Sequence, residues 1–173
     1  MKKFAGKGVY GAVAIGRISV FKKKDLSVKR VHRDDTADEI KRVECAKNQA
    51  REQIKKLYEK ALKEVGEANA QIFEVHMMML DDEDYNSSIE NIIETQKVNA
   101  EYAIAVTADH FAEMFAAMDD AYMQARSADV KDISNRMIAN LMGQKEENNA
   151  SEDKVIICAE DLAPSETVTL DKD

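Results

Sequence analysis

Residues 71–84 read Gln71-Ile72-Phe73-Glu74-Val75-His76-Met77-Met78-Met79-Leu80-Asp81-Asp82-Glu83-Asp84, the most informative stretch of this chain. Placed on a helix, its apolar residues recur at the spacing of a buried face. They are Ile72, Phe73, Met77 and Leu80. His76, Met79 and Glu83 then share a neighbouring face, because residues three and four apart are adjacent on a helix. A histidine, a flexible thioether and a carboxylate presented outward suit docking better than chemistry.

A second block lies on another predicted helix and reads Asp119-Asp120-Ala121-Tyr122-Met123-Gln124-Ala125-Arg126-Ser127-Ala128-Asp129-Val130-Lys131-Asp132. The two blocks together resemble the N-terminal region of Enzyme I of the bacterial phosphoenolpyruvate:sugar phosphotransferase system. In that family an Ile-Phe-Glu-x-His-x-Met-Leu-x-Glu-Asp run is followed by Asp-Asp-x-Tyr-x-x-x-Arg-x-x-Asp-x-x-Asp. The sugar-system enzyme, its nitrogen-regulatory paralogue and fused multi-domain forms share this pattern.

The resemblance extends to both ends of the chain. Residues 6–16 are similar to the family's opening segment, although Tyr10-Gly11-Ala12 stands where Ser-Pro-Gly is usual. Near the other end, Asp161-Leu162-Ala163-Pro164-Ser165-Glu166-Thr167 is close to the family's Asp-Leu-x-Pro-Ser-Glu-Thr. Four motifs in the family's order therefore cover nearly the whole chain.

The resemblance implies an enzyme that moves phosphate from phosphoenolpyruvate through a histidine to HPr, the histidine-containing carrier protein, for sugar uptake. The family's phosphorylated histidine follows in a Gly-Gly-x-Thr-Ser-His segment, and none of His32, His76 or His110 has that context. We therefore expect the phosphohistidine to lie beyond Asp173, in a longer parent enzyme, and assign no catalytic residue here.

The same resemblance implies what the chain lacks by itself. As an N-terminal piece without the phosphohistidine, it is expected to be inactive alone. The family's magnesium and phosphoenolpyruvate site and its dimer contacts belong to a C-terminal barrel. We thus expect no cofactor here and a monomer, from a homodimeric parent.

By resemblance, HPr binds a groove of the helical domain. The matching positions are Glu67, His76, Met78, Met79, Glu83, Asp84, Tyr85, Phe115, Met123 and Arg126. Met79 and Tyr85 stand where the family commonly has leucine. The threonine matching Thr167 lies beside the phosphohistidine in the family, and turn or cap chemistry after Pro164 is the alternative role.

The order of patterns predicts a mainly α fold, with a helical bundle inserted in a partial α/β domain. Residues 13–21 favour two short strands, and residues 155–159 a short buried strand. Thr36-Ala37-Asp38-Glu39 has the spacing of a capping box, and helical periodicity follows as far as Gly66. A further helix is predicted from about Ala68 through Leu80, continuing after an acidic turn from Ser88 to Thr95. Two more are predicted, one after Asn99 and one from near Asp120 to Gly143. The resemblance implies the same division: residues 1–30 and 148–173 form part of a swivelling phosphohistidine domain, and residues 31–147 the helical HPr-binding domain.

Composition narrows the classes of function. The formal net charge of the 173 residues is −8, which argues against a nucleic-acid partner and favours a basic docking partner. The sequence carries no apolar run of about 20 residues, so we expect no membrane span and a cytoplasmic protein. Cys45 and Cys158 lack metal-ligand spacing and are expected to be reduced thiols.

Other interpretations of single residues remain open. The acidic run 81–84 lacks the mid-loop glycine of an EF-hand, and no histidine has a glutamate three positions earlier as di-iron bundles require, so no metal is predicted. His110 fits a packed or half-buried residue, and His32 an exposed one. The alternative function is a stand-alone, non-catalytic helical adaptor.

Overall fold

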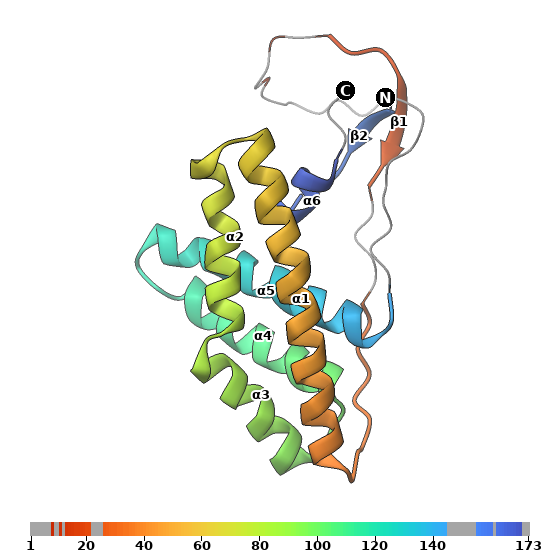
Figure 1. Ribbon diagram of the computed structural model, residues 1–173, viewed down its shortest axis with the longest axis vertical. Coiled ribbons are helices and arrows are strands. Elements are labelled where there is room, and N and C mark those ends of the chain that lie inside the picture. Colours follow the sequence, from red (N-terminus) through yellow and green to blue (C-terminus); the bar gives the residue numbers. More distant parts are fainter. Residues whose placement is uncertain are drawn as a thin grey trace, which may run out of the picture.

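The computed structural model describes residues 8, 11, 13–21, 26–144, 155–160 and 162–170. Within them the chain forms six helices and two strands (Figure 1). Their bounds are β1 Arg17–Val20, α1 Thr36–Glu64, α2 Glu67–Leu80, α3 Glu83–Gln96, α4 Ala100–Ala116, α5 Ala121–Leu141, β2 Val155–Cys158 and α6 Pro164–Thr169. The predicted mainly α fold is confirmed.

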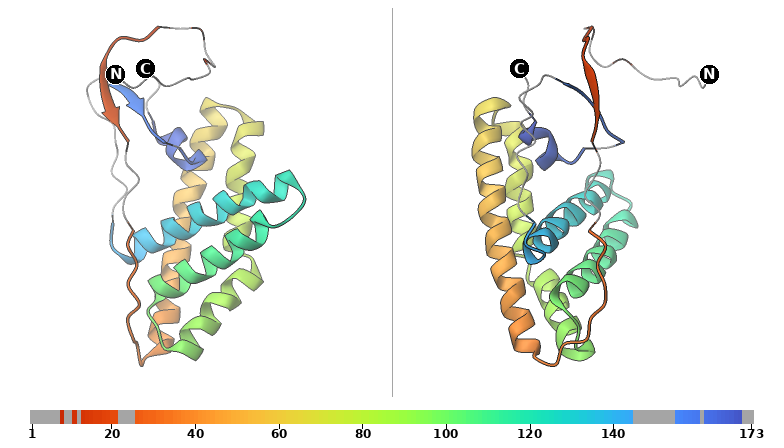
Figure 2. Two further views of the ribbon diagram at one scale, coloured as in Figure 1. Left: turned by 180° about the vertical axis from the view of Figure 1, so that it is seen from behind. Right: turned by 90° about the vertical axis from the view of Figure 1, so that its right-hand side faces the viewer.

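The helices form two layers around one core. α1 and α2 lie side by side in one layer, α4 and α5 cross behind them, and α3 closes one end (Figures 1 and 2). With 29 residues, α1 is roughly 43 Å long and runs the length of the bundle. Its buried residues recur at helical spacing and face the core. They are Glu39, Val43, Ala46, Ala50, Ile54, Leu57 and Ala61.

The start of α1 differs from the predicted capping box. Asp35, not Thr36, is the N-cap, and its carboxylate accepts a hydrogen bond from the Asp38 amide at 2.9 Å. The Glu39 carboxylate does not reach back to the cap. It instead accepts from the Ala100 amide at the start of α4, at 2.7 Å, because that buried amide has no partner within its own helix.

The remaining helix ends follow local signals. Gly66, with a φ of 82°, separates α1 from α2, a conformation that favours glycine. Asp82 caps α3 by accepting from the Tyr85 amide at 2.8 Å, so a new helix begins at Glu83 where the sequence predicted an acidic turn. Asp120 caps α5 by accepting from two amides of its first turn.

The two strands pair with each other in parallel, with Ile18 opposite Ile156. They stand beside the bundle, while α6 lies against α1 (Figure 1). β2 was predicted to be buried, but Ile157 is 36% exposed, because the sheet has only two strands and no layer of described residues covers it. Of the two strands predicted in residues 13–21, one forms.

The domain division at residues 30 and 148 stays a prediction. Most of the opening motif at residues 6–16 lies outside the described residues, as do residues 22–25, 145–154 and 161. Among the helices that the structure describes, none is long and apolar enough to cross a membrane.

The expectation for the end of the chain also stays a prediction. Asp173, beyond which the phosphohistidine is expected, lies outside the described residues, whose last member is Leu170. The α6 helix is therefore the part of the described chain that comes nearest in sequence to the expected nucleophile.

Candidate functional site

The predicted docking residues lie on four helices, most of them near the junction of α2 with α3 and the turn between α4 and α5. Met78 and Met79 are in the last turn of α2, which leads directly into the first turn of α3 with Glu83 and Asp84. Phe115 ends α4, and the short turn after it leads into α5 with Met123. The two helix pairs are held together below the surface, since the Tyr85 ring on α3 packs edge-on against Phe111 on α4 with centroids 5.6 Å apart.

The surface over these ends mixes thioethers, rings and acids. Met78 is 72% exposed, while Met79, Phe115 and Met123 are half-buried. Glu83 and Asp84 are exposed around them. Glu67 is also exposed, but it begins α2 and so lies roughly 18 Å along the helix from Met79. Glu67 therefore lies at the far end of α2 from Met78 and Met79, and the docking roles of these residues stay a prediction.

His76 does not face outward as predicted. Its exposed fraction is 0%, and it points into the bundle with Ala70, Phe73 and Leu80. Its Nε2 lies 3.2 Å from Asp129 Oδ1, and its Nδ1 lies 3.8 Å from Asp132 Oδ2, both on α5. Neither ring nitrogen makes a hydrogen bond of good geometry with the described residues, so these are ion-pair contacts. The buried positions of α2 are Ala70, Phe73, His76 and Leu80, so the buried face includes His76 and leaves Met77 only partly buried.

Asp129 is held ionised by its neighbours. Burial alone would raise the pKa of Asp129, but contact with His76 and Arg126 outweighs it and keeps that pKa below its ordinary value. The Arg126 guanidinium donates to Asp129 Oδ2 at 2.7 Å. A buried carboxylate with two such partners joins α2 to α5.

Tyr85 is likewise buried rather than on the surface, with an exposed fraction of 2%. Its hydroxyl lies 2.7 Å from Ser134 Oγ, and that serine donates its own proton to the Val130 carbonyl at 2.6 Å. The tyrosine hydroxyl is therefore the donor to Ser134. Burial raises the pKa of Tyr85 to about 12, although the hydrogen bond with Ser134 by itself would lower that pKa. Its place in the core follows from the Tyr85, Ile89, Ile93 spacing on α3.

Arg126 is mostly buried, and its guanidinium lies 4.2 Å above the Tyr122 ring. Tyr122 itself is 62% exposed, beside Met123 at the start of α5. Tyr122 was not predicted as a surface residue, nor were the buried Asp129 and the half-buried Asp132 predicted as partners of His76. The signal was present, since all three stand at fixed positions of the 119–132 motif.

Thr167 lies on α6, is exposed, and donates to the Pro164 carbonyl at 2.8 Å. This is a local bond within one turn of α6, and the role of Thr167 beside the phosphohistidine stays a prediction. Its neighbour Ser165 is buried and donates across to Asp132 Oδ1 at 3.1 Å. Asp132 therefore contacts both α6 and His76.

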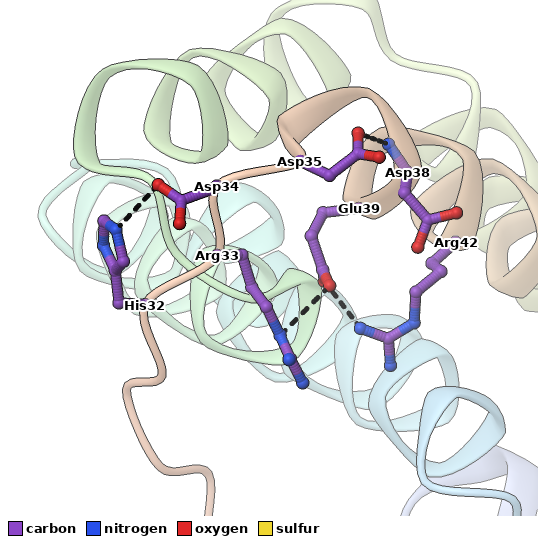
Figure 3. Close-up of a pocket in the computed structure, with 7 residues that line it drawn as sticks. All are labelled: His32, Arg33, Asp34, Asp35, Asp38, Glu39 and Arg42. Carbon is purple, nitrogen blue, oxygen red and sulfur yellow. Dashed lines mark hydrogen bonds and ion pairs between the residues drawn. The ribbon is translucent and has the colours of Figure 1, made fainter.

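A second feature is an open polar pocket of about 530 Å³ at the start of α1 (Figure 3). It is lined by His32, Arg33, Asp34, Asp35, Asp38, Glu39 and Arg42. Glu39, its buried member, accepts from Arg42 Nη1 at 2.6 Å and lies 3.4 Å from Arg33 Nε. The same carboxylate accepts a hydrogen bond from the Ala100 amide, so the pocket joins α1 to α4 and is not a vacant ligand site. We call the charged residues that make this connection the clamp.

The clamp continues to Glu101, which pairs with Arg42. Burial alone would raise the pKa of Glu101, but bonds from backbone, Asn99 and Arg42 lower it below its ordinary value. Burial would lower the pKa of Arg42, and the two glutamates raise it. Each ion thus stabilises the charged form of the other.

The other histidines and possible metal ligands offer little chemistry. His32 is exposed, as predicted, and lies 3.2 Å from Asp34 Oδ1. His110 was predicted to be packed or half-buried, but it is exposed, since its helix turns the neighbouring Ala112 to the core instead. Within the described ranges, no group of three histidine, cysteine or acidic side chains could hold a metal ion.

The chain is similar to known proteins in sequence and in fold. Residues 5–126 match the family model described as PEP-utilising enzyme, N-terminal. The chain is 36% identical over 172 residues to the phosphoenolpyruvate-protein phosphotransferase of Listeria monocytogenes, covering 99% of this chain and 30% of that protein. It is 34% identical over 174 residues to the phosphotransferase of the same name from Bacillus subtilis, again covering 30% of it. The chain therefore spans less than a third of the length of these curated relatives.

Two solved structures share the fold. One is an NMR solution structure of Enzyme I (nEIt), with a TM-score of 0.77 and 32% identity, covering 90% of this chain and 64% of that one. The other is the N-terminal domain of Enzyme 1 - Nitrogen, with a TM-score of 0.69 and 22% identity, covering 92% and 66%.

Proposed function

Because the chain belongs to the PEP-utilising enzymes, whose N-terminal family it matches, we propose that it docks the carrier HPr within a phosphoenolpyruvate-protein phosphotransferase. The supporting observation is the surface formed by the ends of α2 and α4 and the starts of α3 and α5. We call this surface the docking face and define it by Met78, Met79, Glu83, Asp84, Phe115, Tyr122, Met123 and Arg126.

The chemistry of the docking face suits a basic protein partner. Methionine side chains adapt to a partner's shape, and exposed rings supply contact area with little loss of conformational freedom. Acids at the rim would steer a basic face toward them. His76 and Tyr85, both matched to the family's docking set, lie beneath this face and support it instead of touching the partner.

The proposal extends to the whole protein. Phosphate passes from phosphoenolpyruvate to a histidine beyond Asp173 and on to HPr in the cytoplasm, for sugar uptake. Magnesium would bind elsewhere in that protein. Incubation of this chain with phosphoenolpyruvate and magnesium should leave no acid-labile phosphate on His32, His76 or His110. Light scattering should give a monomer at micromolar concentration, since the proposed dimer contacts involve none of these residues.

Calorimetric titration with HPr tests docking directly. Interface energy concentrates in central apolar anchors, so Met79→Ala should weaken binding about tenfold, while Glu67→Ala, remote along α2, should weaken it less than threefold. Met142→Ala is the matched control, because Met142 is exposed at the opposite end of α5. Absence of binding by the folded wild-type chain would refute docking and favour the adaptor alternative. A larger loss from Glu67→Ala would refute the assigned face.

A further inference from the structure

A chain of charged and polar contacts runs beneath the docking face and ends at α6. It begins at Arg126, passes through Asp129 to His76 at 3.2 Å, and continues to Asp132 at 3.8 Å. Ser165 of α6 closes it by donating to Asp132 Oδ1 at 3.1 Å. These contacts join Arg126, Asp129 and Asp132 of α5 to His76 of α2 and to Ser165 of α6.

Burial makes this arrangement selective. His76 is fully buried, Asp129 and Ser165 are nearly so, and a buried polar group is costly unless a partner faces it. The buried His76 ring makes no hydrogen bond of good geometry with the described residues, so the acids of α5 compensate its burial only while they keep their positions beside it. His76 is central to the chain of contacts because its two ring nitrogens face different carboxylates from a single rigid plane.

α6 depends on this contact more than the other helices do. It has only six residues, too few for a helix to persist in water by itself. Ser165 and Val168 are its two buried residues, so a polar contact of Ser165 and the apolar side chain of Val168 both contribute to holding it on the bundle. In Figure 2 it lies between the end of α1 and the strands.

We propose that His76 is a positioning residue: through Asp132 and Ser165 it fixes α6, and with it Thr167, relative to the docking face. This rests on the proposed function, in which Thr167 stands beside the phosphohistidine and HPr occupies the docking face. A phosphoryl group crosses between two histidines only if both are held in line, and a rigid link between docking face and α6 supplies that constraint.

Amide hydrogen exchange in the 173-residue chain measures the link. The reporters are the Thr167 amide, which bonds to the Ala163 carbonyl at 3.1 Å, and the core amide of Ile93 on distant α3. Ser165→Ala should speed exchange at Thr167 at least tenfold with Ile93 within threefold of wild type. His76→Gln should speed exchange at Thr167 at least fivefold, because the link from residue 76 to α6 runs through Asp132.

The double variant His76→Gln/Ser165→Ala should exchange at Thr167 no more than twofold faster than Ser165→Ala alone, because the two changes break one chain. A general loss of packing would instead add the two effects. Asp132→Asn, which keeps the acceptor for Ser165 but removes the charge opposite His76, should give an intermediate rate and replaces His76→Gln if that variant does not fold. Ser88→Ala is the matched control, since Ser88 bonds only locally to the Asp84 carbonyl.

Unchanged exchange at Thr167 in both His76→Gln and Asp132→Asn would overturn the proposal, as would an unprotected Thr167 amide in the wild type. Titration of the same variants with HPr separates this outcome from failure of docking. Ser165→Ala should bind HPr within threefold of wild type, because it leaves the docking face intact. A tenfold loss there would overturn the separation of docking from positioning, whereas absence of binding by the wild type would refute the proposed function alone.

Discussion

At the residue scale, the buried carboxylate of Glu39 makes several polar contacts at once. It is 4% exposed and serves an amide of α4 and two arginines. Glu39→Ala would leave the buried Ala100 amide unpaired and two cations without this acid, so we expect a loss of about 2–3 kcal/mol in the free energy of unfolding, measured by urea denaturation.

The matched control lies one turn and a half further along the same helix. Glu44 pairs with Lys47 at 2.7 Å in the same three-residue step, but its side chain is exposed. Exposed pairs contribute little, so Glu44→Ala should cost no more than about 0.5 kcal/mol. Equal losses for the two variants would show that burial of Glu39 is unimportant.

Asp129 and Glu101 make stability depend on acid. Both have a pKa lowered in the folded chain, so their contribution is complete above their ordinary values of 3.8 and 4.5. It is lost as the pH falls through the lowered values, where the folded state must also take up protons. The melting temperature should therefore drop below about pH 4.5. Glu101→Gln should flatten that drop while lowering stability at neutral pH, and Arg42→Gln should do the same by removing the cation. A drop of unchanged steepness in both would contradict this account.

At the element scale, the end of α3 carries a removable strain. Lys97 is the C-cap and has a left-handed backbone, with φ 50° and ψ 58°, which a side chain disfavours by roughly 1 kcal/mol. Lys97→Gly should therefore stabilise the chain by up to about 1 kcal/mol in urea denaturation, while its larger freedom when unfolded offsets part of the gain. Lys97→Ala keeps the strain and loses only the exposed 3.9 Å contact with Asp34, so it should not stabilise. If both variants were more stable than the wild type, the cause would be loss of the lysine charge and not relief of the backbone strain.

The start and end of a helix could be predicted from the sequence better than the face that the helix turns toward the core. Asn99 and Asp120 mark the starts of α4 and α5, and Gly143 follows the end of α5, because caps and glycines act within a turn. The rotation of α2 could not be found this way. Met77 fits the buried stripe as well as His76 does, and only the acids of α5, more than fifty residues away, decide in favour of His76.

The same limit applies to the candidate site. The family could be assigned from sequence motifs alone, without knowing how the helices pack, and this assignment is confirmed. Which motif residues face a partner depends on tertiary contacts, so Tyr85 was predicted on the surface and lies in the core, while Tyr122 was overlooked. The roles at the docking face stay predictions.

At the scale of the whole molecule, the bundle and the strands differ in how they are stabilised. The bundle encloses a continuous core built from α1 to α5, whereas β1 and β2 form two parallel strands with Ile18 70% exposed. Parallel sheets are normally covered on both faces, and two strands alone are marginal in water. The free energy of folding therefore resides in the helices.

A chain of residues 26–144 should consequently fold on its own. It retains Glu39, Arg42 and Glu101 of the clamp and the His76 contacts with α5. Among the buried residues that the structure describes, it loses only Ser165 and Val168. We expect a single cooperative thermal transition by circular dichroism, coincident with the calorimetric one, at a midpoint a few degrees below that of the 173-residue chain. In the longer chain, amides of β1 and β2 should exchange faster than those of α1 to α5. A broad, non-cooperative transition of the shorter chain would show instead that the strands and α6 are part of one folding unit with the helices.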